Sequence, residues 1–473
     1  MHTTCRISIW KVTILVALAS LTARNGAAQA SAYASVYSFK GGPDGASPNG
    51  LTIGKNGSLY GTTETGGANN CGGDETPFLC GTVFELTAVK GAEWTKTILL
   101  SFNGSDGAMP SQNELFGPGA KPVFGSNGSL YSVTKNGGSS DPIGLLAGGT
   151  VFELAPPAMA GGAWTETVLY NFSGSYNQPH SPFGGVLIGS NGAVYGTTFS
   201  SSYIGDGGPE VDGTVFQLVP PAESGGAWTE NTLVTLPSVG LGMLPDAGVV
   251  SVGGSLYGTT VESDEAGGCG SVYELSPPGT DGGVWTPTAI YTFGGPPGDG
   301  CSSVAPLTVG AGGVIYGTTV DGGSALPCTL LPYLHSGCGT VFQLTPPSTV
   351  GGSGTETIIY NFAGTNGDGA YPVAGVVLGE NGVLYGTTTY GGSATSGSPC
   401  SLSGASGCGT VFELTPPTSP GGAWTENVLH SFTGQNGDGS IPGPLAISPG
   451  GVLYGPTSGG GSAGKGTIFA LEP

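Results

Sequence analysis

The sequence predicts an all-β protein built from seven copies of one four-stranded unit. The segment Leu-Tyr-Gly-Thr-Thr recurs with variations at intervals of 59 to 71 residues, and its tyrosines are Tyr60, Tyr131, Tyr195, Tyr257, Tyr316, Tyr385 and Tyr454. A second segment, Gly-Thr-Val-Phe-Glu/Gln-Leu, follows each copy and begins at Gly81, Gly149, Gly213, Gly270, Gly339, Gly409 and Gly466. Four-stranded units at such a period are the blades of a β-propeller, so we predict a seven-bladed β-propeller.

Each unit holds four segments with strand character, which we name strands A to D in chain order. Strand A is a short apolar run such as 374–379, strand B is Leu-Tyr-Gly-Thr-Thr, and strand C is Gly-Thr-Val-Phe. Strand D runs from Trp to Phe, as in Trp164–Phe172 and Trp424–Phe432. Asn-Gly joins strands A and B at 56–57, 127–128, 191–192 and 381–382. This dipeptide is typical of type I′ hairpin turns, in which both central residues need positive φ.

The two ends of the repeat array predict that the ring closes on itself. The seventh unit ends with its strand C at 466–471, and a lone D-like strand at 33–39 precedes the first unit. We predict that this N-terminal strand completes the last blade, because an open array would leave two exposed edges. Residues 31–473 would then form a single propeller domain of seven repeats of about 60–70 residues.

Residues 1–30 have the pattern of a secretory signal peptide. Arg6 and Lys11 precede an apolar run at 12–23, and Ala28-Gln29-Ala30 forms a small-x-small cleavage site. The apolar run is too short to span a bilayer, and no later segment approaches 18 apolar residues. We therefore expect a secreted, extracytoplasmic protein without membrane insertion.

The charge of the mature chain excludes several classes of partner. Removal of residues 1–30 leaves seven Lys, no Arg and 31 acidic residues, a formal charge of −24. Arginine is the usual bidentate partner of phosphate and carboxylate groups. Nucleic acid and anionic membranes are therefore not expected as partners, and a sialidase activity is not expected either.

The mature chain keeps eight cysteines, an even number that favours disulfides in an oxidising compartment. Three pairs are close in sequence and would each close one loop: Cys71 with Cys80, Cys328 with Cys338, and Cys400 with Cys408. Cys269 and Cys301 remain, and we predict that they bridge neighbouring connections. No Cys-x-x-Cys spacing that would favour zinc occurs.

The repeat resembles the secreted bacterial GloVer (Gloeo/Verruco) tandem-repeat family, and its unit is also similar to an NHL-type blade. The resemblance is carried by Leu-Tyr-Gly-Thr-Thr, then Gly-Gly, then Gly-Thr-Val-Phe-Glu-Leu, as at 384–414, and it covers essentially all of 33–473. It implies an extracytoplasmic repeat protein and supplies no catalytic residues.

Candidate ligand-binding residues gather on the face that should carry the D-to-A and B-to-C connections, which we call the loop face. Long loops on a rigid scaffold often carry function, and the B-to-C loops vary most in length, as at Asp321–Cys338 and Gly391–Cys408. Five D-to-A connections contain Asp-Gly after a strand-ending Phe, at Asp44, Asp106, Asp299, Asp368 and Asp438. These aspartates could form an acidic ring for Ca²⁺ or sugar hydroxyls, with Asp368 and Asp438 as the calcium candidates, or they could simply make the turns. No other cofactor is expected.

Further candidates break the repeat or lie on the same face. The fourth B-to-C loop clusters Glu262, Asp264 and Glu265, and the single histidines His180 and His335 could act as a base or ligand. The repeated tryptophans, by contrast, track the blades and are expected to pack between them.

These observations favour a non-catalytic binding or interaction scaffold for extracellular glycan or protein. The alternative is an extracellular polysaccharide-active enzyme, a lyase or hydrolase, for which the fold alone gives only an analogy. A structural component of the cell surface or matrix is the third possibility.

Overall fold

The computed structural model of the chain describes residues 31–71, 80–89, 93–110, 112–113, 117–118, 121–138, 148–159, 161–173, 180–200, 213–223, 225–236, 241–263, 268–280, 283–324, 328, 336–349, 351–393, 400, 407–419 and 421–473. The predicted signal peptide, 1–30, lies outside these residues. Within them, no helix has the length and apolar character needed to cross a membrane.

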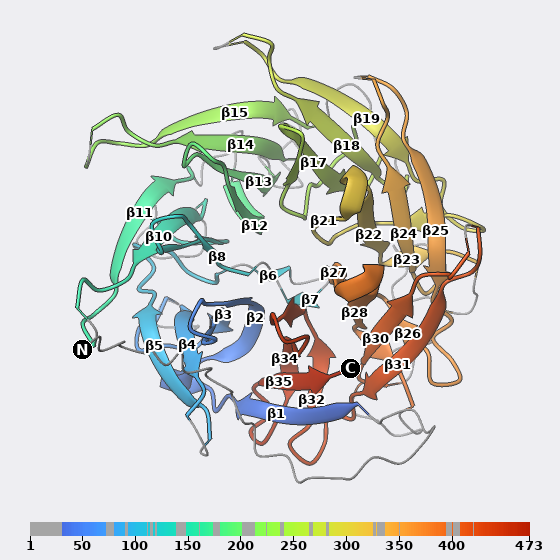
Figure 1. Cartoon of the computed structure of the whole chain (residues 1–473). Helices are drawn as coiled ribbons and strands as arrows, with labels where there is room; N and C mark the ends of the chain where they lie inside the picture. Colours follow the sequence, from blue (N-terminus) through green and yellow to red (C-terminus); the bar gives the residue numbers. More distant parts are fainter. Residues whose placement is uncertain are drawn as a thin grey trace, which may run out of the picture.

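The protein is a seven-bladed β-propeller, as predicted, with the blades arranged in a ring around a central axis (Figure 1). The first three blades are formed by β2 (Ala46–Ile53), β3 (Leu59–Thr65), β4 (Thr82–Thr87) and β5 (Thr95–Ser101); by β8 (Val123–Phe124), β9 (Leu130–Thr134), β10 (Thr150–Ala155) and β11 (Thr165–Asn171); and by β12 (His180–Ile188), β13 (Val194–Ser200), β14 (Thr214–Val219) and β15 (Thr229–Thr235).

The next three blades repeat this antiparallel order. They are formed by β16 (Val250–Val252), β17 (Ser255–Thr260), β18 (Ser271–Ser276) and β19 (Thr286–Thr292); by β21 (Thr308–Val309), β22 (Ile315–Thr319), β24 (Thr340–Thr345) and β25 (Thr355–Asn361); and by β27 (Val377–Leu378), β28 (Leu384–Thr388), β30 (Thr410–Thr415) and β31 (Thr425–Ser431). Short pairs and 3₁₀ turns complete these blades and their connections: β6 (Gln112–Asn113) with β7 (Gly117–Pro118), β20 (Gly300–Cys301) with β23 (Asp321–Gly322), β26 (Gly369–Ala370) with β29 (Tyr390–Gly391), and the turns η1 (Gly42–Asp44), η2 (Ala311–Gly313) and η3 (Glu380–Gly382).

The seventh blade joins the two ends of the chain, which confirms the predicted closure. Its inner strands are β32 (Gly439–Pro442), β33 (Ala446–Ile447), β34 (Leu453–Gly460) and β35 (Thr467–Glu472). The outer strand is β1 (Ala32–Ser38), which pairs antiparallel with β35 from Ala32 opposite Glu472 to Ser38 opposite Thr467. Figure 1 shows β1, in blue, lying along the red strands of the last blade.

The repeated residues have repeated structural roles within each blade. The threonine at the fifth position of Leu-Tyr-Gly-Thr-Thr and of its variants bonds to the hydroxyl at the start of strand C in all seven blades, at 2.8 to 3.1 Å, as between Thr388 and Thr410. The glycine of Leu-Tyr-Gly faces the strand C aromatic ring, so that a Cβ on Gly386 would lie 2.4 Å from Phe412. A glycine is needed there because a buried ring covers the backbone directly.

The Asn-Gly turns follow the predicted type I′ geometry at only one of the four positions. Both central residues have positive φ at Asn381 and Gly382, with φ values of 57° and 80°. At 56–57, 127–128 and 191–192 only the glycine has positive φ. In the first of these turns the N–H of Gly57 bonds to the carbonyl of Gly54, and that of Gly54 bonds to the carbonyl of Ser58. These three turns place only the glycine in the left-handed region, so the type I′ prediction was wrong there.

Tryptophans and backbone hydrogen bonds join neighbouring blades. The strand D tryptophan of one blade packs on the strand B tyrosine of the preceding blade, as Trp164 does on Tyr60 and Trp424 on Tyr316, at centroid distances of 6.0 and 6.2 Å. Each blade also begins with a non-glycine residue at a φ of 52° to 60°, at Ser47, Met109, Ser181, Leu244, Ser302, Tyr371 and Ile441. The N–H of Tyr371 in this set donates to the carbonyl of Cys338 in the preceding blade, and the equivalent bond is made by Ser47, Met109, Ser181, Ser302 and Ile441. The strained backbone thus persists because it ties blades together.

Candidate binding face

The D-to-A turns and the B-to-C loops contact each other through backbone hydrogen bonds, which places both on one face as expected. The carbonyl oxygens of Asp299, Asp368 and Asp438 accept N–H bonds from Gly323, Gly392 and Gly461, at 2.7 to 2.8 Å. Each donor lies at the start of the B-to-C loop of the next blade. At these three junctions the loop face is therefore formed by linked connections.

Four disulfides brace this face, and all four predicted pairs form: Cys71–Cys80, Cys269–Cys301, Cys328–Cys338 and Cys400–Cys408. Three of them pack on a glycine of the adjoining D-to-A turn. A Cβ on Gly104 would lie 3.3 Å from Cys71 Sγ, and one on Gly295 would lie 2.5 Å from Cys269 Sγ. Each such disulfide therefore fixes the base of a B-to-C loop against a turn.

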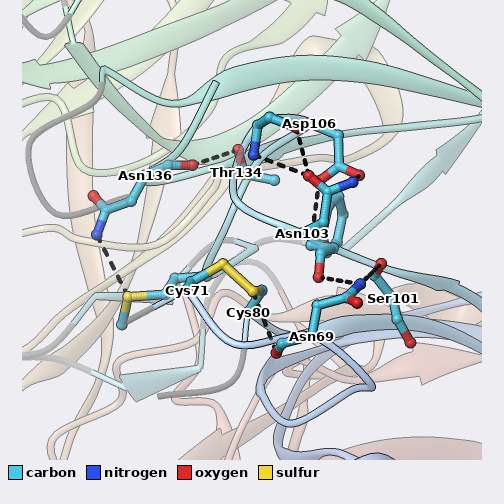
Figure 2. The surroundings of a disulfide bond; sticks show 11 residues. Asn69, Cys71, Cys80, Ser101, Asn103, Asp106, Thr134 and Asn136 are labelled. Carbon is cyan, nitrogen blue, oxygen red and sulfur yellow. Dashed lines mark hydrogen bonds between the residues drawn. A yellow bond between two sulfur atoms is a disulfide. The ribbon is translucent and has the colours of Figure 1, made fainter. Parts of the chain in front are cut away.

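Figure 2 shows this arrangement at Cys71–Cys80, where the Asp106 turn lies nearby. The side-chain amide of Asn69, next to the disulfide, donates to the carbonyl oxygens of Ser101 and Phe102, at 3.0 Å each. These bonds connect the start of the B-to-C loop to the end of strand D in the same blade. The first B-to-C loop is thereby held at its base by a covalent bond and by two hydrogen bonds.

The five predicted aspartates all lie in these turns, and each carboxylate accepts an N–H from the residue that follows the strand-ending Phe. The donors are the N–H groups of Lys40, Asn103, Gly294, Ala363 and Thr433, at 2.6 to 2.8 Å. Three of the carboxylates also accept the N–H of the glycine that follows them, as Asp368 does from Gly369 at 2.7 Å. The aspartates thus order their turns, and they remain separate from one another around the ring.

Asp44 forms an ion pair with a lysine from the next blade. Lys96 Nζ lies 3.1 Å from Asp44 Oδ1 and 4.5 Å from the Phe39 ring centroid, with its side chain almost fully buried. Burial alone would raise the pKa of Asp44, but the bonds from Tyr37, the Lys40 N–H and Lys96 outweigh it and lower that pKa. Burial also lowers the pKa of Lys96.

Asp438 has the richest surroundings of the five. Tyr33 donates to its Oδ1 at 2.8 Å, His430 Nε2 lies 3.4 Å from the same atom, and both Thr433 donors reach Oδ2. Burial would raise its pKa, but these partners, with His430 the strongest, lower the pKa to about 2. The Tyr33 and His430 rings stack at 3.8 Å.

Three further carboxylates, which the sequence analysis did not select, face the remaining aspartates. Glu166 is hydrogen-bonded to Asp106, and Glu356 and Glu426 face Asp299 and Asp368. These glutamates are the third residue of Trp-Thr-Glu in strand D, or of its equivalent Gly-Thr-Glu in the fifth blade. An alignment of the seven repeats could have found them, because it places these glutamates at the position of Lys96 in the first blade, which pairs with Asp44.

The other predicted candidates do not meet at one point. Glu262 forms an isolated backbone bridge with Met243, and His180 begins β12 with Nδ1 3.1 Å from Ser181 Oγ. Burial lowers the pKa of His180. Asp264, Glu265 and His335 lie outside the described residues. Across the described part of the chain, no group of three or more His, Cys, Asp or Glu side chains is placed to hold a metal ion.

A mainly apolar cavity of about 300 Å³ lies on the axis, among the A segments of six blades. Its walls include Phe183, Val186, Leu307 and Leu445, with Lys121 and Asp246 as its charged residues. The inner segments approach so closely that a Cβ on Gly184 would lie 1.9 Å from the backbone nitrogen of Gly248. Two adjacent blades therefore make direct backbone contact at the axis.

Comparisons with known proteins give one family and several distant folds. Among solved structures, the chain is similar to a PQQ-bound aldose sugar dehydrogenase from Streptomyces coelicolor, with 13% identity, a TM-score of 0.40, and coverage of 93% of this chain and 98% of that one. It is also similar to a Trichoderma reesei protein of carbohydrate-active enzyme family AA12, with 13% identity, a TM-score of 0.37 and coverage of 94% and 96%. A gluconolactonase from Xanthomonas campestris gives 10% identity, a TM-score of 0.38 and coverage of 93% and 89%.

Likenesses at this level assign no function. Comparison with curated proteins gave no match. The Gloeobacter/Verrucomicrobia repeat, in contrast, matches residues 117–399, which is more than half of the sequence. The chain belongs to the Gloeobacter/Verrucomicrobia repeat family.

Proposed function

We propose that this protein is a secreted, non-catalytic propeller that binds extracellular glycan or protein through its loop face. The observation that carries this proposal is the bracing of the B-to-C loops by four disulfides on a single face. A rigid base under loops of variable length is a common arrangement for recognition. The disulfides are also consistent with an extracytoplasmic location, and the predicted signal peptide would supply the export route.

The charges of the chain support a neutral or basic ligand. Seven lysines and no arginine remain after residue 30, so polyanions such as nucleic acid would be repelled. The turn aspartates Asp44, Asp106, Asp299, Asp368 and Asp438, together with Glu262, Asp264, Glu265, His180 and His335, are the proposed contact residues of this face.

The experiment is a binding screen of the protein lacking residues 1–30 against immobilised polysaccharides and glycans, with calcium and with chelator. In a test variant, the loops 321–338 and 391–408 are each replaced by the short seventh loop, 461–465. A control variant instead shortens the C-to-D connection 416–423, on the opposite face. We expect binding to be lost in the first variant and kept in the second.

Two results would overturn the proposal. Binding that survives replacement of both loops would move the recognition site elsewhere. Release of new reducing ends or of unsaturated sugar products from a bound polysaccharide, in proportion to time and protein concentration, would establish the enzymatic alternative.

A further inference from the structure

One position on the outer strand faces the D-to-A turn of the preceding blade at the five junctions whose turn carries a described aspartate. This position is the second residue of the observed outer strand, directly after the Thr of Trp-Thr-Glu. It is occupied by Lys96, Glu166, Glu230, Pro287, Glu356, Glu426 and, in the closing strand, Tyr33. Where the turn carries Asp, this position completes a contact between blades. Lys96 gives an ion pair with Asp44 at 3.1 Å, and Tyr33 gives a hydrogen bond to Asp438 at 2.8 Å.

At the other three junctions whose D-to-A turn carries an aspartate, the residue that faces this aspartate is also an acid. Glu166 meets Asp106 between the first and second blades, Glu356 meets Asp299 between the fourth and fifth, and Glu426 meets Asp368 between the fifth and sixth. Two carboxylates at one junction repel each other when both are ionised. The same structural position therefore joins blades in two junctions and, with both acids charged, would push them apart in three.

The surroundings of the three glutamates offer no compensating positive charge. The titratable groups that face Glu166, Glu356 and Glu426 among the described residues are the paired aspartates, with Tyr291 beside Glu356 and Tyr360 beside the Asp368–Glu426 pair. The Oε1 atom of each glutamate is inaccessible to solvent and has no hydrogen-bond partner among the described residues. A bare anionic oxygen in that setting is costly, whereas a neutral carboxyl group is tolerated.

The turn geometry decides which acid of each pair carries the negative charge. Asp299 accepts N–H bonds from Gly294 and Gly300 at 2.6 Å each and a hydroxyl bond from Tyr291 at 2.9 Å. Asp368 accepts N–H bonds from Ala363 and Gly369 at 2.6 and 2.7 Å. Asp106 accepts the N–H of Asn103 at 2.8 Å. These donors stabilise the aspartate anions, so the proton of each pair resides on the glutamate.

We propose that the three acid pairs are proton-dependent junctions, which hold adjacent blades together when Glu166, Glu356 and Glu426 are protonated and loosen them when the proton leaves. The closing junction and the Lys96 junction lack this dependence on a glutamate proton. Alkaline conditions should therefore weaken these three contacts between blades and leave the Asp44 and Asp438 junctions intact.

The pKa values agree with the geometry. Burial, followed by the charge of Asp106, raises the pKa of Glu166 to about 8. Burial and the paired aspartate raise the pKa of Glu356 and of Glu426 to about 7. A carboxyl group whose pKa is raised on folding adds stability in full below its unfolded value of 4.5, and this stability is lost as the pH rises through the folded value. The expected loss therefore falls between pH 4.5 and about 8.

The test is the melting temperature of the chain lacking residues 1–30 between pH 5 and 9, in buffers of equal ionic strength. We expect a fall of about 5 °C across this range for the wild type. The triple variant E166Q/E356Q/E426Q carries a neutral isostere of the protonated acid, so it should melt near the wild type at pH 5 and above it at pH 9. Hydrogen exchange, with each rate divided by the intrinsic rate at the same pH, should show protection factors in β11, β25 and β31 that fall at high pH in the wild type but not in the triple Gln variant.

A matched control separates this effect from the general repulsion of an acidic protein. The variant E85Q/E153Q/E413Q removes three partly exposed carboxylates from strand C of the first, second and sixth blades, and it should keep the wild-type pH profile. If the triple Gln variant does not fold, Glu426→Lys, which copies the Lys96–Asp44 pair, should raise the melting temperature at pH 9. A flat wild-type profile, or an equal fall in the triple Gln variant, would overturn the proposal.

Discussion

The hydroxyl of Tyr33 donates a hydrogen bond to Asp438 across 405 positions of sequence. Tyr33 occupies the position in the closing strand that glutamate or lysine occupies in five other blades and Pro287 in the fourth. Its ring also stacks on His430 and meets Phe432 edge-on, at 3.8 and 5.9 Å. One side chain therefore fixes the N-terminal strand to both the sixth and the seventh blades.

Substitution of Tyr33 should weaken the closure in two measurable steps. Tyr33→Phe removes only the bond to Asp438, with an expected loss of about 1 kcal/mol in the free energy of unfolding. Tyr33→Ala also removes the ring contacts, with an expected loss of about 3 kcal/mol. Urea unfolding measures both, and Ser35→Ala, on the exposed side of the same strand, is the control. Equal stability of all four proteins would mean that this strand does not hold the ring.

Deletion of residues 31–40 should have a much larger effect than either substitution. The deletion removes the outer strand of the seventh blade and exposes the edge of β35, which then lacks its hydrogen-bonding partner. We expect a strongly lowered melting temperature in calorimetry and a tendency to associate. A deletion variant with the same melting temperature as the intact chain would contradict closure by β1.

Asp438 should make the closing junction sensitive to strong acid. Its pKa of about 2 lies below the unfolded value of 3.8, so its contribution is present above pH 3.8 and is lost as the pH falls through 2. Asp438→Asn should therefore cost about 2 kcal/mol at pH 7, and the difference from wild type should shrink towards pH 2. Denaturation at pH 7, 4 and 2.5 measures this trend, with exposed Glu223→Gln as the control. A difference independent of pH would assign the cost to packing.

The disulfide Cys269–Cys301 should contribute more to stability than Cys328–Cys338. The first disulfide joins cysteines 32 positions apart in sequence, and the second joins cysteines 10 positions apart. A longer closed loop removes more entropy from the unfolded chain. Replacing both cysteines by serine should thus cost about 1 kcal/mol more for the first pair than for the second. Non-reducing peptide mapping verifies the pairing in each variant. The reverse order of stability would show that native packing around Cys328 outweighs loop entropy.

Calcium and magnesium at equal ionic strength should raise the melting temperature equally. The turn carboxylates already accept two or more hydrogen bonds each, as Asp368 does from Ala363 and Gly369, and magnesium screens surface charge as well as calcium does. A shift specific to calcium, lost in Asp368→Asn and Asp438→Asn, would instead establish the calcium site considered from the sequence.

The fold could be predicted because its determinants are repeated within the sequence. The counterparts of Thr388 and Thr410 have the same role in all seven blades, and those of Tyr60 and Trp164 recur in most of them, so their spacing alone revealed the blades and their order. The D-like strand at the start was visible because its counterpart was missing at the end. Even the pairing of Cys269 with Cys301 followed from the face on which each connection should lie.

The partners of the candidate site residues were much harder to predict. Asp106 and Glu166 meet only because two blades are adjacent, and each residue looks ordinary within its own repeat. The turn at Asn56 and Gly57 differs from the turn at Asn381 and Gly382 although both loops have the same length, so the Asn-Gly dipeptide does not encode the turn type. Contacts between repeats arise from the geometry of the ring, which the sequence of a single repeat cannot specify.

The pairing of β1 with β35 also sets the order in which the molecule can be completed. The earliest strand of the domain to leave the ribosome has as its hydrogen-bonding partner the last one, so it must wait unpaired while six blades are synthesised. Joining the two ends of so long a segment costs loop entropy, which makes this step slow compared with the hairpins inside each blade. A nascent chain would therefore stay open until its final residues emerge, and truncated products would expose an unpaired strand edge that quality-control proteases can recognise.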